Sequence, residues 1–256
     1  IDVMIGLSIW PRPDPAKDEL LIRVGGCSLA PGDTRNLRGD CDIMGPTTPY
    51  LVGGDLSGVV VKVGGEGASS SSSSSPSSTF KPGDRVCAMF DFRPKGGLAE
   101  YATIKRANTS HVPENLSLLE AAALPSSALA AMRCAETQMR KGDRVLVLGA
   151  SGGVGTHLVQ FLRKFGSSHI AGTSSDAKLL HGLGVDRVID YRCDDWSEVK
   201  EYQGENRFDL IIDLVGSYES WRKAKSLKVL KVAGEGGGTR PSLETTVTCK
   251  CTATPT

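Results

Sequence analysis

The stretch from Val145 to Gly155 limits the possible folds of this chain more than any other. It opens with a wholly apolar run, Val145 to Leu148, which is typical of a parallel strand covered on both faces. Glycines follow this run, and a segment compatible with an apolar helix follows the glycines. A strand, a glycine-rich turn and a helix start can together bind a diphosphate, because backbone N–H groups and the helix dipole attract an anion.

The glycine turn is therefore predicted to bind the diphosphate of a dinucleotide. Gly152 would let the backbone approach the ligand, and Gly155 would let the helix pack closely on the strand. Ala150 stands where the G-x-G-x-x-G pattern has its first glycine, so an ordinary tight turn is the alternative. The flanking strand and helix, and a second strand about 20 residues further on, favour the dinucleotide site. The residues predicted to contact the cofactor here are Ser151, Gly152, Gly153, Val154 and Gly155.

Apolar strands alternate with helical segments after this turn, which predicts a doubly wound parallel sheet of the α/β class. We expect this domain to span residues 126–233. The further strands predicted in it are 170–173, 187–191 and 208–215.

The part of the chain before the turn has short strand-like runs separated by Gly and Pro, which predicts a small β-rich domain over residues 1–125. Within it, seven consecutive serines at 69–75 predict a disordered, dispensable surface loop over residues 68–78. Ser117 and Glu120 form a capping-box signature at the start of a helix near the end of this domain.

Residues 234–256 do not continue the α/β pattern. The sheet needs another apolar strand there, but the sequence has a Gly-rich run followed by a Thr-rich polar stretch. We expect an irregular tail, as at a truncated or altered C-terminus.

The charge balance and the cysteines restrict the partners and the compartment. The formal net charge is +1 with no basic run, which argues against a nucleic-acid partner. No apolar run approaches the length of a membrane span. The seven cysteines are scattered without a C-x-x-C pair, so a reducing intracellular compartment is expected, cytoplasmic or mitochondrial. The chain starts at Ile1, so a targeting peptide can lie outside the sequence given.

Several stretches together resemble the medium-chain dehydrogenase/reductase superfamily, in particular its zinc-independent quinone-oxidoreductase branch. Within that branch, the segment from Leu214 to Trp221 most resembles the reticulon-interacting mitochondrial reductases. The resemblance implies a GroES-like domain followed by a Rossmann domain, and a C-terminal segment, missing here, that completes the first domain. The stretches that carry it include Pro31-Gly-Asp33, Gly54-Asp-Leu-Ser-Gly-Val59, Phe80-Lys-Pro-Gly-Asp-Arg-Val86, Gly97-Leu-Ala-Glu-Tyr101, residues 142–155 and Val188-Ile-Asp-Tyr191.

Zinc ligands are missing from the positions that the resemblance assigns to them. Zinc alcohol dehydrogenases of this superfamily have Cys where Ala30 stands and Gly-His-Glu where residues 53–55 read Gly-Gly-Asp. Their structural site needs four closely spaced cysteines in a stretch where this chain has Cys87 alone. No metal is therefore expected.

The end of the second strand of the α/β domain predicts NADPH as the cofactor. An NAD site usually has an acid there, whereas this chain has Ser174 and Ser175, with Lys178 in the next helix and Tyr191 after the third strand. Hydroxyls and an ammonium group suit a 2′-phosphate, although a solvated helix lysine is the alternative for Lys178. Asp176 is expected to cap the helix and point away. The remaining residues predicted to contact the cofactor, on the basis of the resemblance, are Leu214 and Val215.

No catalytic residue can be assigned. The quinone oxidoreductases often have an Asn and tyrosines on the substrate side of the nicotinamide, but the matching positions here are Ala30, Arg35 and Cys41. Three further side chains are candidates, each with a structural role as the alternative: Tyr50 and Tyr101 as pocket residues, and His157 as an acid or base.

Two functions of different classes are compatible with this sequence. The first is an NADPH-dependent oxidoreductase that reduces a small molecule, a quinone or an α,β-unsaturated carbonyl, by hydride transfer without zinc. The alternative is a non-catalytic NADPH-binding protein, or an incomplete reductase fragment, that acts through a partner interaction. A homodimer is an expected assembly of an intact form.

Overall fold

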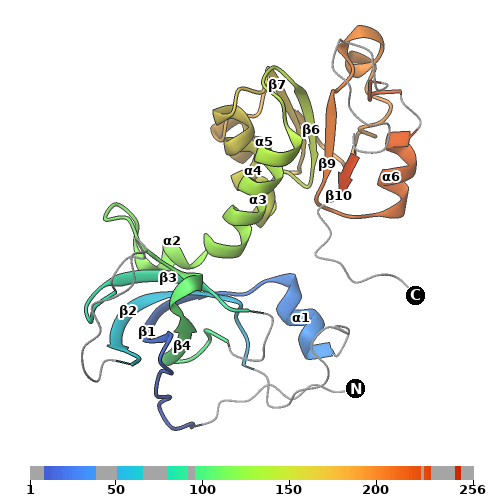
Figure 1. Cartoon of the computed structure of the whole chain (residues 1–256). Helices are drawn as coiled ribbons and strands as arrows, with labels where there is room; N and C mark the ends of the chain where they lie inside the picture. The colour runs from blue at the N-terminus through green and yellow to red at the C-terminus, as the bar shows by residue number, and fades with distance from the viewer. Residues whose placement is uncertain are drawn as a thin grey trace. The chain divides into compact units, whose positions relative to one another are not determined.

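The computed structural model describes residues 9–38, 51–65, 80–91, 96–225 and 228–231, together with the backbone of 246–248. The chain divides between Ser126 and Ser127 into two compact units, each built on its own sheet (Figure 1). The predicted boundary lies between residues 125 and 126. The serine-rich loop over 68–78 lies outside the described residues, as do Cys41, Tyr50 and most of the predicted tail.

The first unit contains a five-stranded antiparallel sheet with the strand order β4-β1-β2-β3-β5. Alternate residues of these strands point into one apolar core, which includes Leu20, Ile22, Leu56 and Val86. The predicted β-rich domain is therefore confirmed. The strands are β1 Glu19–Ser28, β2 Asp55–Val63, β3 Arg85–Met89, β4 Tyr101–Lys105 and β5 Thr109–His111.

Short helices complete this unit: α1 Pro31–Arg38, the 3-10 turn η1 Arg106–Asn108 and α2 Leu118–Ala122. The capping box predicted for α2 is present, because Glu120 N–H donates to Ser117 Oγ at 3.2 Å and Ser117 N–H donates to Glu120 Oε2 at 2.8 Å. The next helix, α3 Pro125–Gln138, begins at a proline, which needs no hydrogen bond from its nitrogen at a helix start.

The second unit contains a five-stranded parallel sheet with the order β10-β9-β6-β7-β8, which confirms the predicted doubly wound fold (Figure 1). Its strands are β6 Arg144–Leu148, β7 His169–Thr173, β8 Arg187–Ile189, β9 Leu210–Asp213 and β10 Thr246–Thr248. Its other helices are α4 Gly153–Lys164, α5 Ala177–Gly182 and α6 Tyr218–Lys225, with the 3-10 turns η2 Lys200–Tyr202 and η3 Gly204–Asn206.

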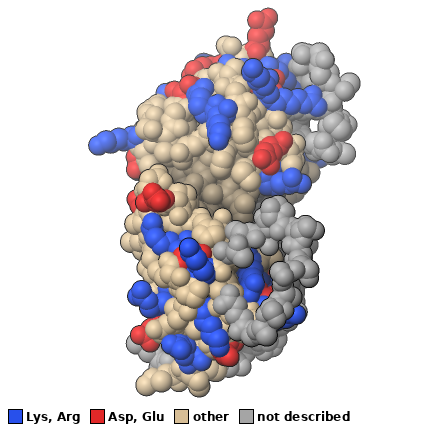
Figure 2. Space-filling model, turned by 60° about the vertical axis from the view of Figure 1, so that its left-hand side comes forward, with Lys and Arg blue, Asp and Glu red and all other residues tan. Residues whose placement is uncertain are grey.

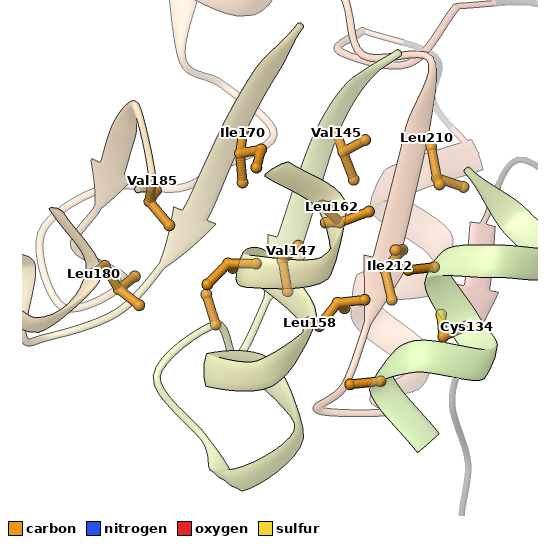
Figure 3. Close-up of a cluster of buried hydrophobic side chains, with 14 residues drawn as sticks. Cys134, Val145, Val147, Leu158, Leu162, Ile170, Leu180, Val185, Leu210 and Ile212 are labelled. Atoms are coloured by element: carbon orange, nitrogen blue, oxygen red, sulfur yellow. The ribbon is translucent and has the colours of Figure 1, made fainter. Parts of the chain in front are cut away.

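The central strand β6 is buried on both faces, as its apolar run predicts. Val145 and Val147 pack with Leu158 of α4 and with residues of α3 on one face (Figure 3). Leu146 and Leu148 pack into a second cluster on the opposite face. Both faces of the sheet are therefore covered by packed segments. A ligand site is expected in the loops at the carboxyl edge of the sheet.

The prediction of an irregular tail is wrong at residues 246–248. These residues form β10, which pairs in parallel with β9 and places Thr246 beside Ile211 and Thr248 beside Asp213. The polar composition of the stretch concealed the strand, although Thr and Val are β-branched and suit a pleated backbone.

Candidate dinucleotide-binding site

The glycine turn leaves β6 at its carboxyl end and leads directly into α4. Gly149 has a φ of +78°, and its N–H donates to Thr173 Oγ1 at 2.9 Å, which ties the turn to β7. Gly152 is the N-cap residue of α4, with extended backbone and no side chain to accept from the first N–H groups of the helix. Such a helix start can accept an anion in place of a cap.

The glycines of this turn have different steric surroundings. A Cβ atom at Gly155 would lie 2.4 Å from Gly149 O and 2.5 Å from Ala150 O, so only glycine lets α4 pack this closely. A Cβ atom at Gly153 would meet only Ser127 Oγ, at an ordinary 3.5 Å. Gly152 and Gly153 are both exposed. Gly155 therefore serves packing, whereas the backbone at Gly152 and Gly153 is open to a ligand.

The carboxyl ends of β7 and β8 lie side by side next to this turn. Ser174 N–H donates to Ile189 O at 3.1 Å, which brings the segment after β7 beside the segment after β8. Ser175 and Lys178 are exposed on the first segment, and Tyr191 is 61% exposed on the second. The structure thus brings these three predicted residues to one edge of the sheet.

Ser174 has a local structural role in this segment. It is 1% exposed, and its Oγ accepts from Asp176 N–H at 2.8 Å. Asp176 in turn caps α5, because its Oδ1 accepts from Leu179 N–H at 3.0 Å, as predicted. Ser175 is consequently the better placed of the two serines for a ligand in solvent.

Arg192 is a cation at this edge that the sequence reasoning missed. Its Nε and Nη2 donate to the two Asp190 carboxylate oxygens at 2.9 and 2.6 Å, and its Nη2 also approaches Ser175 O at 3.5 Å. The guanidinium group lowers the pKa of Asp190 to about 2. Its position directly after Tyr191 could have marked it as a candidate for phosphate recognition, since Arg is the residue most suited to that task.

The end of β9 completes the edge with Leu214 and Val215. Leu214 N–H donates to Leu148 O at 3.1 Å, and the Val215 side chain lies against Gly149, 3.2 Å from an added Cβ atom. Asp213 holds this turn, because its Oδ1 accepts from the N–H groups of Val215 and Gly216, both at 2.9 Å. Asp213 is 1% exposed, and its Oδ2 has no hydrogen-bond partner among the described residues.

We expect Asp213→Ala to destabilise the chain by about 1–3 kcal/mol, because two part-buried N–H groups lose their acceptor. Asp213→Asn is the matched control, since its amide oxygen can still accept from both groups while the unpaired Oδ2 is replaced. Urea unfolding of the three proteins measures the difference. If Asp213→Asn is as unstable as Asp213→Ala, the charge and not the hydrogen bonds stabilises this turn.

The structure adds little evidence for Tyr101 and His157 as residues of a substrate site. Tyr101 is half-buried in β4, and the Arg12 guanidinium lies 5.4 Å from the centre of its ring. His157 is half-buried on α4, and burial lowers its pKa. No three His, Cys, Asp or Glu side chains of the described residues gather closely enough to hold a metal ion.

The described surface is mixed in charge. Acidic and basic side chains are interspersed on each unit, on the face that Figure 2 shows. No helix in the described part of the chain is long and apolar enough to cross a membrane.

Two family models match the chain, one in each unit. Residues 16–114 match the alcohol dehydrogenase GroES-like domain, and residues 153–236 match a model described as zinc-binding dehydrogenase.

Characterised proteins match most of the chain. The 2-methylene-furan-3-one reductase of Solanum lycopersicum is 34% identical over 247 residues, which cover 93% of this chain and 58% of that protein. The mitochondrial NAD(P)H oxidoreductase RTN4IP1 of Bos taurus is 33% identical over 235 residues, which cover 84% of this chain and 55% of the relative. The solved quinone oxidoreductase from Coxiella burnetii has a TM-score of 0.70 and 27% identity, covering 92% of this chain and 70% of that structure. The chain thus spans less than three fifths of the length of these two curated relatives.

Proposed function

The chain belongs to the medium-chain dehydrogenase/reductase superfamily, and from this premise we propose that it is an NADPH-dependent reductase of quinones or α,β-unsaturated carbonyls that works without zinc. The resemblance read from the sequence is confirmed at the level of the family. The observation that carries the proposal is the glycine turn at the carboxyl edge of β6, where α4 begins without a capping side chain.

The cofactor would lie along the carboxyl edge of the parallel sheet. The first N–H groups of α4 and the open backbone at Gly152 and Gly153 would hold its diphosphate, and Leu214 and Val215 lie on the same edge. When bound, the cofactor supplies the hydride. The role of the protein is to bind and orient the cofactor and the substrate, and no residue is assigned as a proton donor.

We infer a preference for NADPH over NADH from the groups after β7 and β8. The Lys178 ammonium and the Ser175 hydroxyl are exposed there to a 2′-phosphate, and the Arg192 guanidinium, whose Nε and Nη2 donate to Asp190, would offer its Nη1. The two acids nearby already have partners, since Asp176 caps α5 and Asp190 pairs with Arg192. An NAD-selective edge would instead present a free acid to the ribose hydroxyls.

The substrate class follows from the chemistry that the relatives' names share. The tomato relative is a reductase of a conjugated enone, and the bacterial structure is a quinone oxidoreductase. Both substrates are conjugated carbonyl compounds with an electrophilic carbon that can accept a hydride. We expect an intracellular location, cytoplasmic or mitochondrial, in line with the mitochondrial relative.

The direct test is NADPH binding by calorimetry, followed by NADPH oxidation with a panel of quinones and enones. Saturable binding and turnover are expected. Binding without turnover on any of these compounds would support the non-catalytic alternative, and the absence of binding would overturn both.

Lys178→Ala is expected to weaken NADPH about tenfold, because an exposed charge-assisted hydrogen bond to the phosphate is lost. NADH affinity should hardly change, since NADH has no phosphate there. Ser175→Asp should reverse the preference by repelling the phosphate. Ser174→Asp, which the sequence alone would suggest, is less suitable because Ser174 is buried.

The measurement is the pair of dissociation constants for NADPH and NADH in each variant. Lys164→Ala, which removes an exposed lysine from the last turn of α4, is the matched control. Equal weakening of both cofactors by Lys178→Ala would show that Lys178 does not recognise the 2′-phosphate.

A further inference from the structure

The strand order of the second unit indicates where the two halves of a bound cofactor would lie. In the proposed site, the diphosphate is at the end of β6, and the groups suited to the 2′-phosphate stand at the ends of β7 and β8. That phosphate belongs to the adenosine half of the cofactor. Strand β9 flanks β6 on the other side. The nicotinamide half would therefore extend across the end of β9, toward the turn at residues 214–216, the β9 turn.

One buried carboxylate shapes the β9 turn. Asp213, the last residue of β9, accepts through Oδ1 from Val215 N–H and Gly216 N–H, both at 2.9 Å. Gly216 has a φ of +77°, so the backbone takes a left-handed conformation where the second hydrogen bond closes the turn. The turn brings the exposed Val215 side chain against Gly149, the first residue after β6. The Asp213 side chain thus fixes the backbone next to the glycine turn.

The second oxygen of this carboxylate destabilises the fold. Asp213 is 1% exposed, and its Oδ2 has no hydrogen-bond partner among the described residues. A buried polar atom without a partner lowers stability, and proteins retain such atoms chiefly at functional sites. Asp209, directly before β9, gives the contrast, because its Oδ2 accepts from Arg144 N–H at 2.8 Å and its Oδ1 from Lys231 Nζ at 2.7 Å. Asp209 is satisfied as a structural acid is, whereas Asp213 is not.

We propose that Asp213 is a positioning residue for the nicotinamide ring of the cofactor. It acts through the β9 turn, which it holds in one conformation before the cofactor binds. A turn that is already ordered loses less entropy on binding, and a ring held in one orientation keeps its reactive carbon aligned with the substrate. This inference rests on the proposed function, because it needs a dinucleotide at the carboxyl edge of the sheet.

Two ligands that differ in the nicotinamide ring alone test the proposal without turnover. NADPH and ADP-ribose 2′-phosphate share the diphosphate, both riboses and the 2′-phosphate. Their dissociation constants are measured by calorimetry for the parent chain and for Asp213→Ala. The substitution should weaken NADPH about tenfold, roughly the factor that ordering one backbone residue costs. ADP-ribose 2′-phosphate should bind nearly as before, because it has no ring to place on the β9 turn.

Asp209→Ala is the matched control, because it removes a partnered acid beside the same strand. It should lower the melting temperature and leave the ratio of the two dissociation constants unchanged. Asp213→Asn should also keep the parent ratio, since its amide oxygen can accept from both N–H groups of the β9 turn. If Asp213→Ala does not fold, Gly216→Ala decides the question. It strains the turn at its positive φ, leaves the carboxylate in place, and should weaken NADPH selectively as well.

A merely structural acid would change the affinities for both ligands together. Equal weakening of NADPH and ADP-ribose 2′-phosphate by the folded variants, or no weakening of either, would therefore overturn the positioning role. The proposed function would survive that result, because the parent chain would still bind NADPH. If the parent chain binds neither ligand, the proposed function fails, and the positioning role fails with it.

Discussion

Gly153→Val is expected to abolish dinucleotide binding and to leave the fold intact. An added Cβ atom meets only Ser127 Oγ, at 3.5 Å, so the chain itself accepts a side chain at this position. The valine would, however, stand at the exposed start of α4, where we propose that the diphosphate approaches the backbone. We expect NADPH affinity to fall at least about a hundredfold, which corresponds to about 2.7 kcal/mol.

Calorimetry with NADPH and a thermal melt of the apo-protein measure the two halves of this expectation. Gly182→Val, in the last turn of α5, is the control, because a Cβ atom there meets nothing within 4 Å and the position is distant in sequence from the glycine turn. NADPH affinity that survives Gly153→Val would move the diphosphate away from this turn and remove the main support for the proposed function.

Gly155→Ala should have the opposite pattern and destabilise the fold even without a cofactor. Its Cβ atom would lie 2.4 Å from Gly149 O and 2.5 Å from Ala150 O, and backbone atoms cannot move aside as a flexible side chain can. Overpacking of this kind costs up to about 3 kcal/mol. The melting temperature should fall by roughly 6–12 °C for a chain of this size.

The melting temperature of the apo-protein is the decisive measurement for Gly155→Ala. An unchanged value would show that α4 can shift along the sheet at little cost, and the close packing seen here would then not explain the glycine. We therefore expect Gly153 to be needed for access of the ligand and Gly155, two positions later, to be needed for packing.

Features set by neighbouring residues could be predicted from the sequence. The Ser117–Glu120 capping box and the Asp176 cap each depend on side chains three positions from the N–H groups that they accept. The same holds for the turn after β6, because an apolar run followed by glycines defines the strand, the turn and the helix in a single stretch. The fold class followed from repeating this pattern along the chain.

Features that depend on distant segments could not be predicted. The strand β10 exists because β9 supplies its hydrogen bonds, and a short Thr-rich stretch does not reveal such a partner. Ser174 and Ser175 are alike in sequence, but the sheet buries one and exposes the other. Arg192 lies near Ser175 only because β7 and β8 pair in the sheet, and this pairing cannot be read from either segment alone.

The separation of the glycine turn from the exposed ends of β7 and β8 has an evolutionary consequence. In the proposed site, affinity for any dinucleotide depends on the glycine turn, where Gly153 must leave room for the ligand and Gly155 must pack closely on the backbone, so few substitutions are tolerated. The proposed choice between two cofactors depends instead on Ser175, Lys178 and Arg192, all of them exposed. Descendants of this chain could therefore change their reductant through a few surface substitutions, with the core and the diphosphate site inherited unaltered.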